Sequence, residues 1–117
     1  NRKNRFTGSV YLLMGNRTFS SAHMLASSFS CYEMGTTIGE ETGQPLISYG
    51  ELVYMKLPNT RCDAWSSSKS FYQACADSSN GSRGVIPDYE VVSTVDDLKS
   101  GRDAVMDFTL DLIRNNK

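Results

Sequence analysis

Residues 9–22 read SVYLLMGNRTFSSA, a stretch that indicates a strand turning directly into a helix. The run 9–14 is apolar and rich in residues that favour strands, and Gly15 closes it. Thr18 and Ser20 then offer side chains that can cap the N-terminus of a helix. The stretch therefore predicts a buried strand, a tight turn and a helix, with Ser20 at the helix start.

The predicted helix after Ser20 has two distinct sides. One is apolar, because four residues recur at positions i, i+3, i+4 and i+7: Ala22, Leu25, Ala26 and Phe29. The other is polar and holds Ser20, His23 and Ser27. We expect the apolar side to face the core and His23 to lie at the helix surface. The alternative is that His23, one turn after Ser20, acts as a base toward the Ser20 hydroxyl.

The rest of the chain alternates strand-like and turn-like segments. Strands are expected at residues 35–39, 46–57 and 63–74, the second with a possible turn near Gly50. Residues 77–84 (DSSNGSRG) predict a flexible polar loop. A last helix is expected after Ser93 or Thr94, interrupted at Gly101. With 117 residues and no internal repeat or linker, the chain predicts one domain.

Composition excludes several classes of function. The formal net charge is -1, without the basic excess typical of nucleic-acid binders, and we interpret the cluster Arg2, Lys3 and Arg5 as a solvated end. No apolar run approaches the roughly 20 residues of a membrane helix. No cofactor is indicated.

The three cysteines, Cys31, Cys62 and Cys75, match no zinc-binding spacing, and a single histidine makes a metal site a poor interpretation. Three cysteines cannot all pair within one chain. We expect free thiols, with a Cys62–Cys75 disulfide as the alternative if the protein is exported.

Four segments resemble the tail-specific, or C-terminal processing, serine peptidase family, and they occur in the family's order. Residues 6–22 resemble its nucleophile segment, where a strand runs into a Thr-x-Ser-Ala turn. Residues 38–43 (IGEETG) resemble its Gly-Glu-x-Thr-Gly loop, and residues 57–60 (LPNT) its Leu-Pro-Asn strand end. Residues 84–103 contain GVIPD, VDDL and GRD, which resemble its closing pattern. Together these segments span nearly the whole chain.

The resemblance implies an α/β fold of the crotonase/ClpP-like type, in which sheet and helices form a layered sandwich. Residues 1–117 would be the C-terminal part of a single catalytic domain. Ser20 would be the nucleophile, and the backbone N–H of Ser21 would stabilise the oxyanion. A helix start suits this task because its N–H groups are free and its dipole is positive there. On spacing alone, a serine at this place is more often a cap.

The chain departs from the family where many members carry their catalytic lysine. Gln44 and Pro45 stand just after the Gly-Glu-x-Thr loop, and no lysine follows until Lys56. The tricorn-like branch instead takes a histidine from an earlier part of the domain, so we expect the base to lie outside this chain. His23 is the weaker alternative for the base, and Asp77 is a candidate acid partner.

Two functions follow from the resemblance. The first is hydrolysis of peptide bonds in peptide or protein substrates, in the periplasm or cell envelope. The second is ligand or peptide binding without catalysis, as in interphotoreceptor retinoid-binding protein, which has the same fold. In either case we expect the 117-residue chain alone to be inactive and to self-associate through exposed apolar surface.

Overall fold

The computed structural model describes residues 6–115, so the basic residues Arg2, Lys3 and Arg5 lie outside the described part. Within that part the elements follow in the order β1 (Tyr11–Met14), α1 (Ser21–Cys31), β2 (Thr36–Gly39), β3 (Ile47–Lys56), β4 (Asp63–Tyr72), β5 (Tyr89–Glu90), α2 (Val95–Ser100) and α3 (Ala104–Asn115). The strand–turn–helix at the start, the three following strands and the helix break at Gly101 confirm the order expected from the sequence. The mixed content of helix and sheet is that of an α/β protein.

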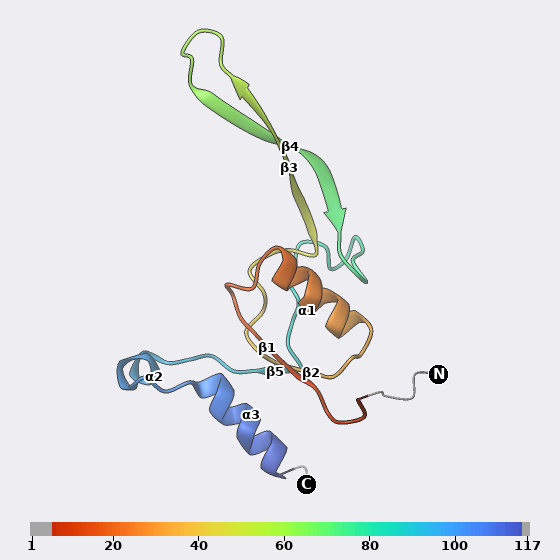
Figure 1. Cartoon of the computed structure of the whole chain (residues 1–117), viewed down its shortest axis with the longest axis vertical. Coiled ribbons are helices and arrows are strands. Elements are labelled where there is room, and N and C mark those ends of the chain that lie inside the picture. The colour runs from red at the N-terminus through yellow and green to blue at the C-terminus, as the bar shows by residue number, and fades with distance from the viewer. Residues whose placement is uncertain (1–5, 116–117) are drawn as a thin grey trace.

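We call the part of the structure outside the hairpin β3–β4 the body. A small parallel sheet forms its centre. Its strand order is β1-β2-β5, and β1 runs parallel to β2 with Tyr11 opposite Thr36 and Met14 opposite Gly39. Parallel neighbours need a crossover connection, and α1 supplies it. Figure 1 shows this sheet between α1 and α3, both of which contact it. The central strand β2 is accordingly buried, with Ile38 fully enclosed.

The side of α1 that faces the core differs from the one predicted. Ala26 and Phe29 are buried as expected, but Leu25 is 55% exposed, and the polar residues His23 and Ser27 are buried instead. The Ser27 hydroxyl and the Nδ1 of His23 can be buried because each has a hydrogen-bond partner. The Ser27 hydroxyl donates to the carbonyl of Ala74, which follows β4.

His23 is a core residue, so its expected place at the helix surface is wrong. Its side chain is fully enclosed, and Nδ1 shares a hydrogen bond of 2.9 Å with the hydroxyl of Thr42. The same hydroxyl accepts the backbone N–H of Val85 at 2.8 Å. Burial lowers the pKa of His23, because the charged imidazolium would lose its hydration. The imidazole is therefore uncharged at neutral pH, and it fills part of the core on the buried side of α1.

The loop after β2 is clamped against residues 83–85. The Glu41 carboxylate accepts hydrogen bonds from the Arg83 guanidinium at 2.6 and 2.9 Å and from the N–H of Gly84 at 2.8 Å. The Arg83 hydrogen bond is the main reason that the pKa of Glu41 lies below its ordinary value. The expected flexible loop 77–84 is thus anchored at its C-terminal end.

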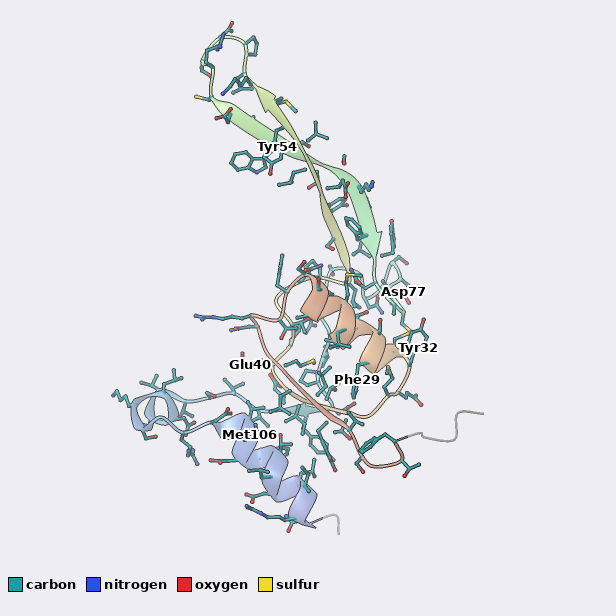
Figure 2. The ribbon with its side chains drawn as sticks, in the orientation of Figure 1. Phe29, Tyr32, Glu40, Tyr54, Asp77 and Met106 are labelled. Carbon is teal, nitrogen blue, oxygen red and sulfur yellow. A yellow bond between two sulfur atoms is a disulfide. The ribbon has the colours of Figure 1, made fainter. Side chains whose placement is uncertain are left out.

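Strands β3 and β4 form a long antiparallel hairpin that projects from the body (Figure 1). Its tip lies between the end of β3 at Lys56 and the start of β4 at Asp63. Strand β3 runs through Gly50 without the turn considered there, but the ladder is interrupted at Glu51, between the pairs Gly50–Lys69 and Leu52–Ser67. There Glu51 has a positive φ of 57°, and the Ser68 hydroxyl donates to the Glu51 carbonyl. Figure 2 shows Tyr54 far out on this arm, where its ring lies 6.3 Å from that of Trp65.

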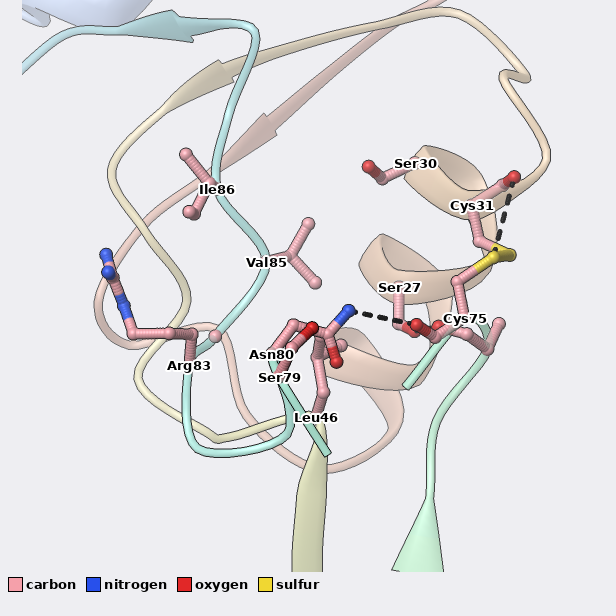
Figure 3. Close-up of a pocket in the computed structure, with 12 residues that line it drawn as sticks. Ser27, Ser30, Cys31, Leu46, Cys75, Ser79, Asn80, Arg83, Val85 and Ile86 are labelled. Carbon is pink, nitrogen blue, oxygen red and sulfur yellow. Dashed lines mark hydrogen bonds between the residues drawn. A yellow bond between two sulfur atoms is a disulfide. The ribbon is translucent and has the colours of Figure 1, made fainter. Parts of the chain in front are cut away.

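A disulfide joins Cys31 to Cys75, so the alternative Cys62–Cys75 pairing is wrong and, of the expected free thiols, only Cys62 is confirmed. Cys62 is free and exposed, because it lies near the tip of the hairpin. Strand β4 returns the chain to the body, and this brings Cys75 beside the C-terminal end of α1 (Figure 3). Which cysteines meet is therefore determined by the hairpin.

Local contacts define both ends of α2. Thr94 accepts the N–H of Asp97, and the Asp97 carboxylate accepts the N–H of Thr94, which completes a capping box. The Thr94 hydroxyl and then Arg102 lower the pKa of Asp97 to about 2. Gly101, with φ of 69°, ends α2.

The disulfide predicts a specific pattern of thiol reactivity. Iodoacetamide added to the unfolded, unreduced chain should modify Cys62 alone, and mass spectrometry should show all three cysteines modified after reduction. Closing a segment with a sequence separation of 44 residues stabilises the folded state, so reduction should lower the free energy of unfolding by up to about 4 kcal/mol. Modification of Cys31 in the unreduced chain would contradict the pairing.

The burial of His23 predicts a pH dependence of stability. Its folded pKa lies below the ordinary value of 6.5, so the unfolded chain binds more protons once the pH falls below 6.5. The free energy of unfolding, measured by urea titration, should therefore be constant above pH 7. It should fall between pH 6.5 and 5 by at most about 1.4 kcal/mol per pH unit.

The variant His23→Gln serves as the control, since it removes the only histidine of the chain. Carboxylates with lowered pKa values, such as Glu41 and Asp97, lose stabilisation only below their ordinary values of 4.5 and 3.8. The variant should therefore show no slope between pH 6.5 and 5. An equal slope in both proteins would show that His23 is not responsible.

Candidate functional site

Ser20 has the most unusual backbone of the turn between β1 and α1. Its φ is 54° and its ψ is -124°, a combination that residues other than glycine seldom adopt. The preceding turn is closed by the Thr18 N–H, which donates to the Gly15 carbonyl, and by the Gly15 N–H, which donates to the Thr18 hydroxyl. Ser20 is exposed.

Neither predicted cap performs capping. The Ser20 side chain makes no cap hydrogen bond to α1, and Thr18 uses its hydroxyl within the turn. A strained backbone persists only where its surroundings hold it, and such residues concentrate at functional sites. A serine on a sharp strand-to-helix turn also presents its Oγ outward, as nucleophilic serines require. The conformation therefore makes Ser20 the centre of the candidate site.

The side chain of Gln44 supports the strained backbone of Ser20 by a hydrogen bond. Its Oε1 accepts the backbone N–H of Ser20 at 2.7 Å, and its Nε2 donates to the Ser48 hydroxyl at 3.0 Å. The loop approaches closely at Gly43, where an added Cβ would lie 2.0 Å from the Asn16 carbonyl oxygen. Gln44 was not predicted as a site residue. Its place just after the Gly-Glu-x-Thr loop, where the family carries lysine, was the signal in the sequence.

The backbone N–H of Ser21 is the first of α1. Within residues 6–115 it has no hydrogen-bond acceptor, whereas the N–H of Ser20 is occupied by Gln44. The first turn of α1 contains no acidic side chain that would compete for a negative charge. A free N–H at a helix N-terminus can donate to an oxyanion.

His23 and Asp77 are not brought to Ser20. His23 is turned into the core toward Thr42, and its Nε2 has no partner among the described residues. Asp77 follows the end of the hairpin that joins the body, which we call the foot of the hairpin (Figure 2). There it accepts hydrogen bonds from Ser79 and Asn80. The Ser79 hydroxyl is the main reason that the pKa of Asp77 is lowered. No described side chain makes a hydrogen bond to Ser20 Oγ.

Two pockets flank α1. One, of about 340 Å³, opens at Ser20 and is lined by Phe19, Ser20, Met24, Gln44, Ser48, Tyr49, Gly50, Glu51, Phe71 and Gln73. The other, of about 320 Å³, lies around the disulfide and the C-terminal half of the helix (Figure 3). Residues 6–115 contain neither a group of three side chains suited to a metal ion nor a helix able to cross a membrane.

Comparison with known proteins finds solved structures that share this fold. The chain superposes over 96% of its length, with a TM-score of 0.63 and 24% identity, on a protein from Parabacteroides merdae described as a candidate peptidase. It superposes over 93% of its length on tricorn protease, with a TM-score of 0.60 and 18% identity. It spans only 34% and 10% of those two chains. No family model and no curated protein matches the sequence, so the likeness establishes a fold shared with parts of these peptidases.

Proposed function

We propose that the protein containing this chain is a serine peptidase of the C-terminal processing family and that Ser20 is its nucleophile. The observation that carries the proposal is the backbone of Ser20, held at φ 54° and ψ -124° between β1 and α1 with its hydroxyl exposed and not used as a cap. The peptidase descriptions of both structural neighbours support the same class of reaction. The layered crotonase/ClpP-like architecture is part of this proposal.

The proposed reaction is acyl transfer. Ser20 Oγ attacks the carbonyl carbon of a peptide bond while a base takes the hydroxyl proton, and the N–H of Ser21 donates to the oxyanion. The C–N bond then breaks, and the leaving amine takes up that proton. Water next attacks the ester on Ser20 and releases the carboxylic acid and the free serine hydroxyl.

The base is proposed to come from a part of the protein outside residues 1–117. Gln44 occupies the place of the family's lysine and cannot take a proton at neutral pH. His23 is committed to Thr42 in the core. Since the chain spans 34% of the first structural neighbour, a comparable protein has ample room for the missing group.

An extracytoplasmic location is proposed for the protein. The Cys31–Cys75 disulfide supports it, because structural disulfides persist mainly in oxidising compartments. The proposed substrates are peptides or proteins.

Ser20 should react with a fluorophosphonate in the full-length protein, and mass spectrometry of the labelled peptide should locate the adduct there. Ser20→Ala should abolish labelling. Ser30→Ala, which changes an exposed serine of α1, should leave labelling unchanged. The isolated 117-residue chain should not turn over an unstructured peptide.

Two results would contradict this proposal. Folded full-length protein that resists the fluorophosphonate would favour the alternative, a ligand- or peptide-binding module of the same fold. Peptide turnover by the isolated chain, lost in Ser20→Ala, would show that the base lies within residues 1–117.

We also propose that the isolated chain self-associates. Large apolar side chains are exposed on both strands of the hairpin: Tyr49, Leu52, Val53, Tyr54, Met55, Trp65, Phe71 and Tyr72. Such surface tends to become buried against another molecule. Sedimentation velocity should show species larger than 13.0 kDa at micromolar concentration. The double variant Tyr54→Thr/Trp65→Thr should shift them toward monomer, and a clean wild-type monomer would contradict the prediction.

A further inference from the structure

We infer that the pocket beside Ser20 binds a large apolar side chain of the substrate, that of the residue whose carbonyl carbon Ser20 attacks. This inference rests on the proposed function, because it takes Ser20 as the reacting group. Ser20 itself lines the pocket, so the pocket is within reach of the side chain of a substrate residue that acylates Ser20. The other residues that line the pocket then determine which substrate side chains fit.

Apolar groups line the pocket from two separate parts of the fold. Phe19 and Met24 come from the turn and the first turns of α1, and Tyr49 and Phe71 come from the foot of the hairpin. All four are exposed to a degree unusual for large apolar side chains, between 41% and 73%. A substrate side chain placed among them would bury apolar surface on both sides, which is the main source of affinity in such pockets.

The shape of the pocket depends on Gly50. An added Cβ at this position would lie 3.0 Å from the Phe71 ring, closer than side chains normally pack. Glycine therefore lets the ring lie beside the backbone of β3 and keeps the volume at about 340 Å³. That space suits a leucine, methionine or phenylalanine side chain.

The polar groups of the pocket do not favour a charged side chain. Its single carboxylate, Glu51, lies 3.5 Å from the Lys69 ammonium on the neighbouring strand, so Glu51 already has a basic partner. Gln44 is engaged by Ser20 and Ser48. A basic or acidic substrate side chain would lose hydration here without gaining a partner.

Peptidyl diphenyl phosphonates that differ only in the side chain next to phosphorus test this inference on the full-length protein. Ser20 Oγ forms a bond to phosphorus, the P–OPh bond breaks, and phenol leaves with the serine proton. Reagents carrying Phe, Leu, Ala, Lys and Glu side chains are compared by their second-order labelling rates. A small alkyl fluorophosphonate, which has no such side chain, reports the reactivity of Ser20 itself.

The Phe and Leu reagents should label Ser20 at least about tenfold faster than the Ala, Lys and Glu reagents. Gly50→Val and Phe71→Ala should each reduce this preference, measured in each variant as the ratio of the Phe labelling rate to the Ala labelling rate. Tyr72→Ala is the matched control for Phe71→Ala, because Tyr72 is the next residue of β4 and does not line the pocket. It should leave the preference unchanged.

Each outcome separates the inference from the proposed function. Fluorophosphonate labelling of Ser20 combined with a flat ranking, or with faster labelling by the Lys or Glu reagent, overturns the apolar pocket and leaves the nucleophile intact. A Lys preference lost in Glu51→Gln would assign the pocket to basic side chains instead. Absence of fluorophosphonate labelling in the folded protein overturns the proposed function and the inference with it.

Discussion

The hydroxyl of Thr42 is the contact on which the rest of the structure depends. It shares a hydrogen bond with His23 inside α1 and accepts the backbone N–H of Val85. One side chain thereby links the helix, the loop after β2 and the segment that leads to β5. Because His23 and Thr42 are both buried, loss of either partner would leave a polar group without compensation in the core.

The loop after β2, which Thr42 fixes in place, also supports the backbone conformation of Ser20. Two residues after Thr42, Gln44 accepts the N–H of Ser20 and so supports a backbone conformation that would otherwise relax. The loop can reach the turn because Gly43 has no side chain to meet the Asn16 carbonyl. The geometry proposed for catalysis is therefore a consequence of core packing, since the position of the loop is set by Thr42 and by the pairing of Glu41 with Arg83.

The hairpin is the least supported part of the fold, because a two-stranded sheet alone is marginally stable in water. Its foot is nevertheless attached to the body. The N–H of Gln73 donates to the Leu46 carbonyl, and the disulfide ties Cys75 to the end of α1. These attachments place Tyr49 and Phe71 beside Ser20, so the foot of the arm contributes to the pocket while the outer part stays exposed.

Local sequence was enough to predict the strand before Gly15, the helix after Ser20, the two strands now seen as β3 and β4, and the break at Gly101. These depend on residues that are close neighbours in the chain, and the resemblance of ordered motifs pointed to the peptidase fold. The burial of His23, the pairing of Cys31 with Cys75 and the support of Ser20 by Gln44 all depend on tertiary contacts. Each of those outcomes depends on which distant segments meet, and sequence spacing carries no measure of that distance.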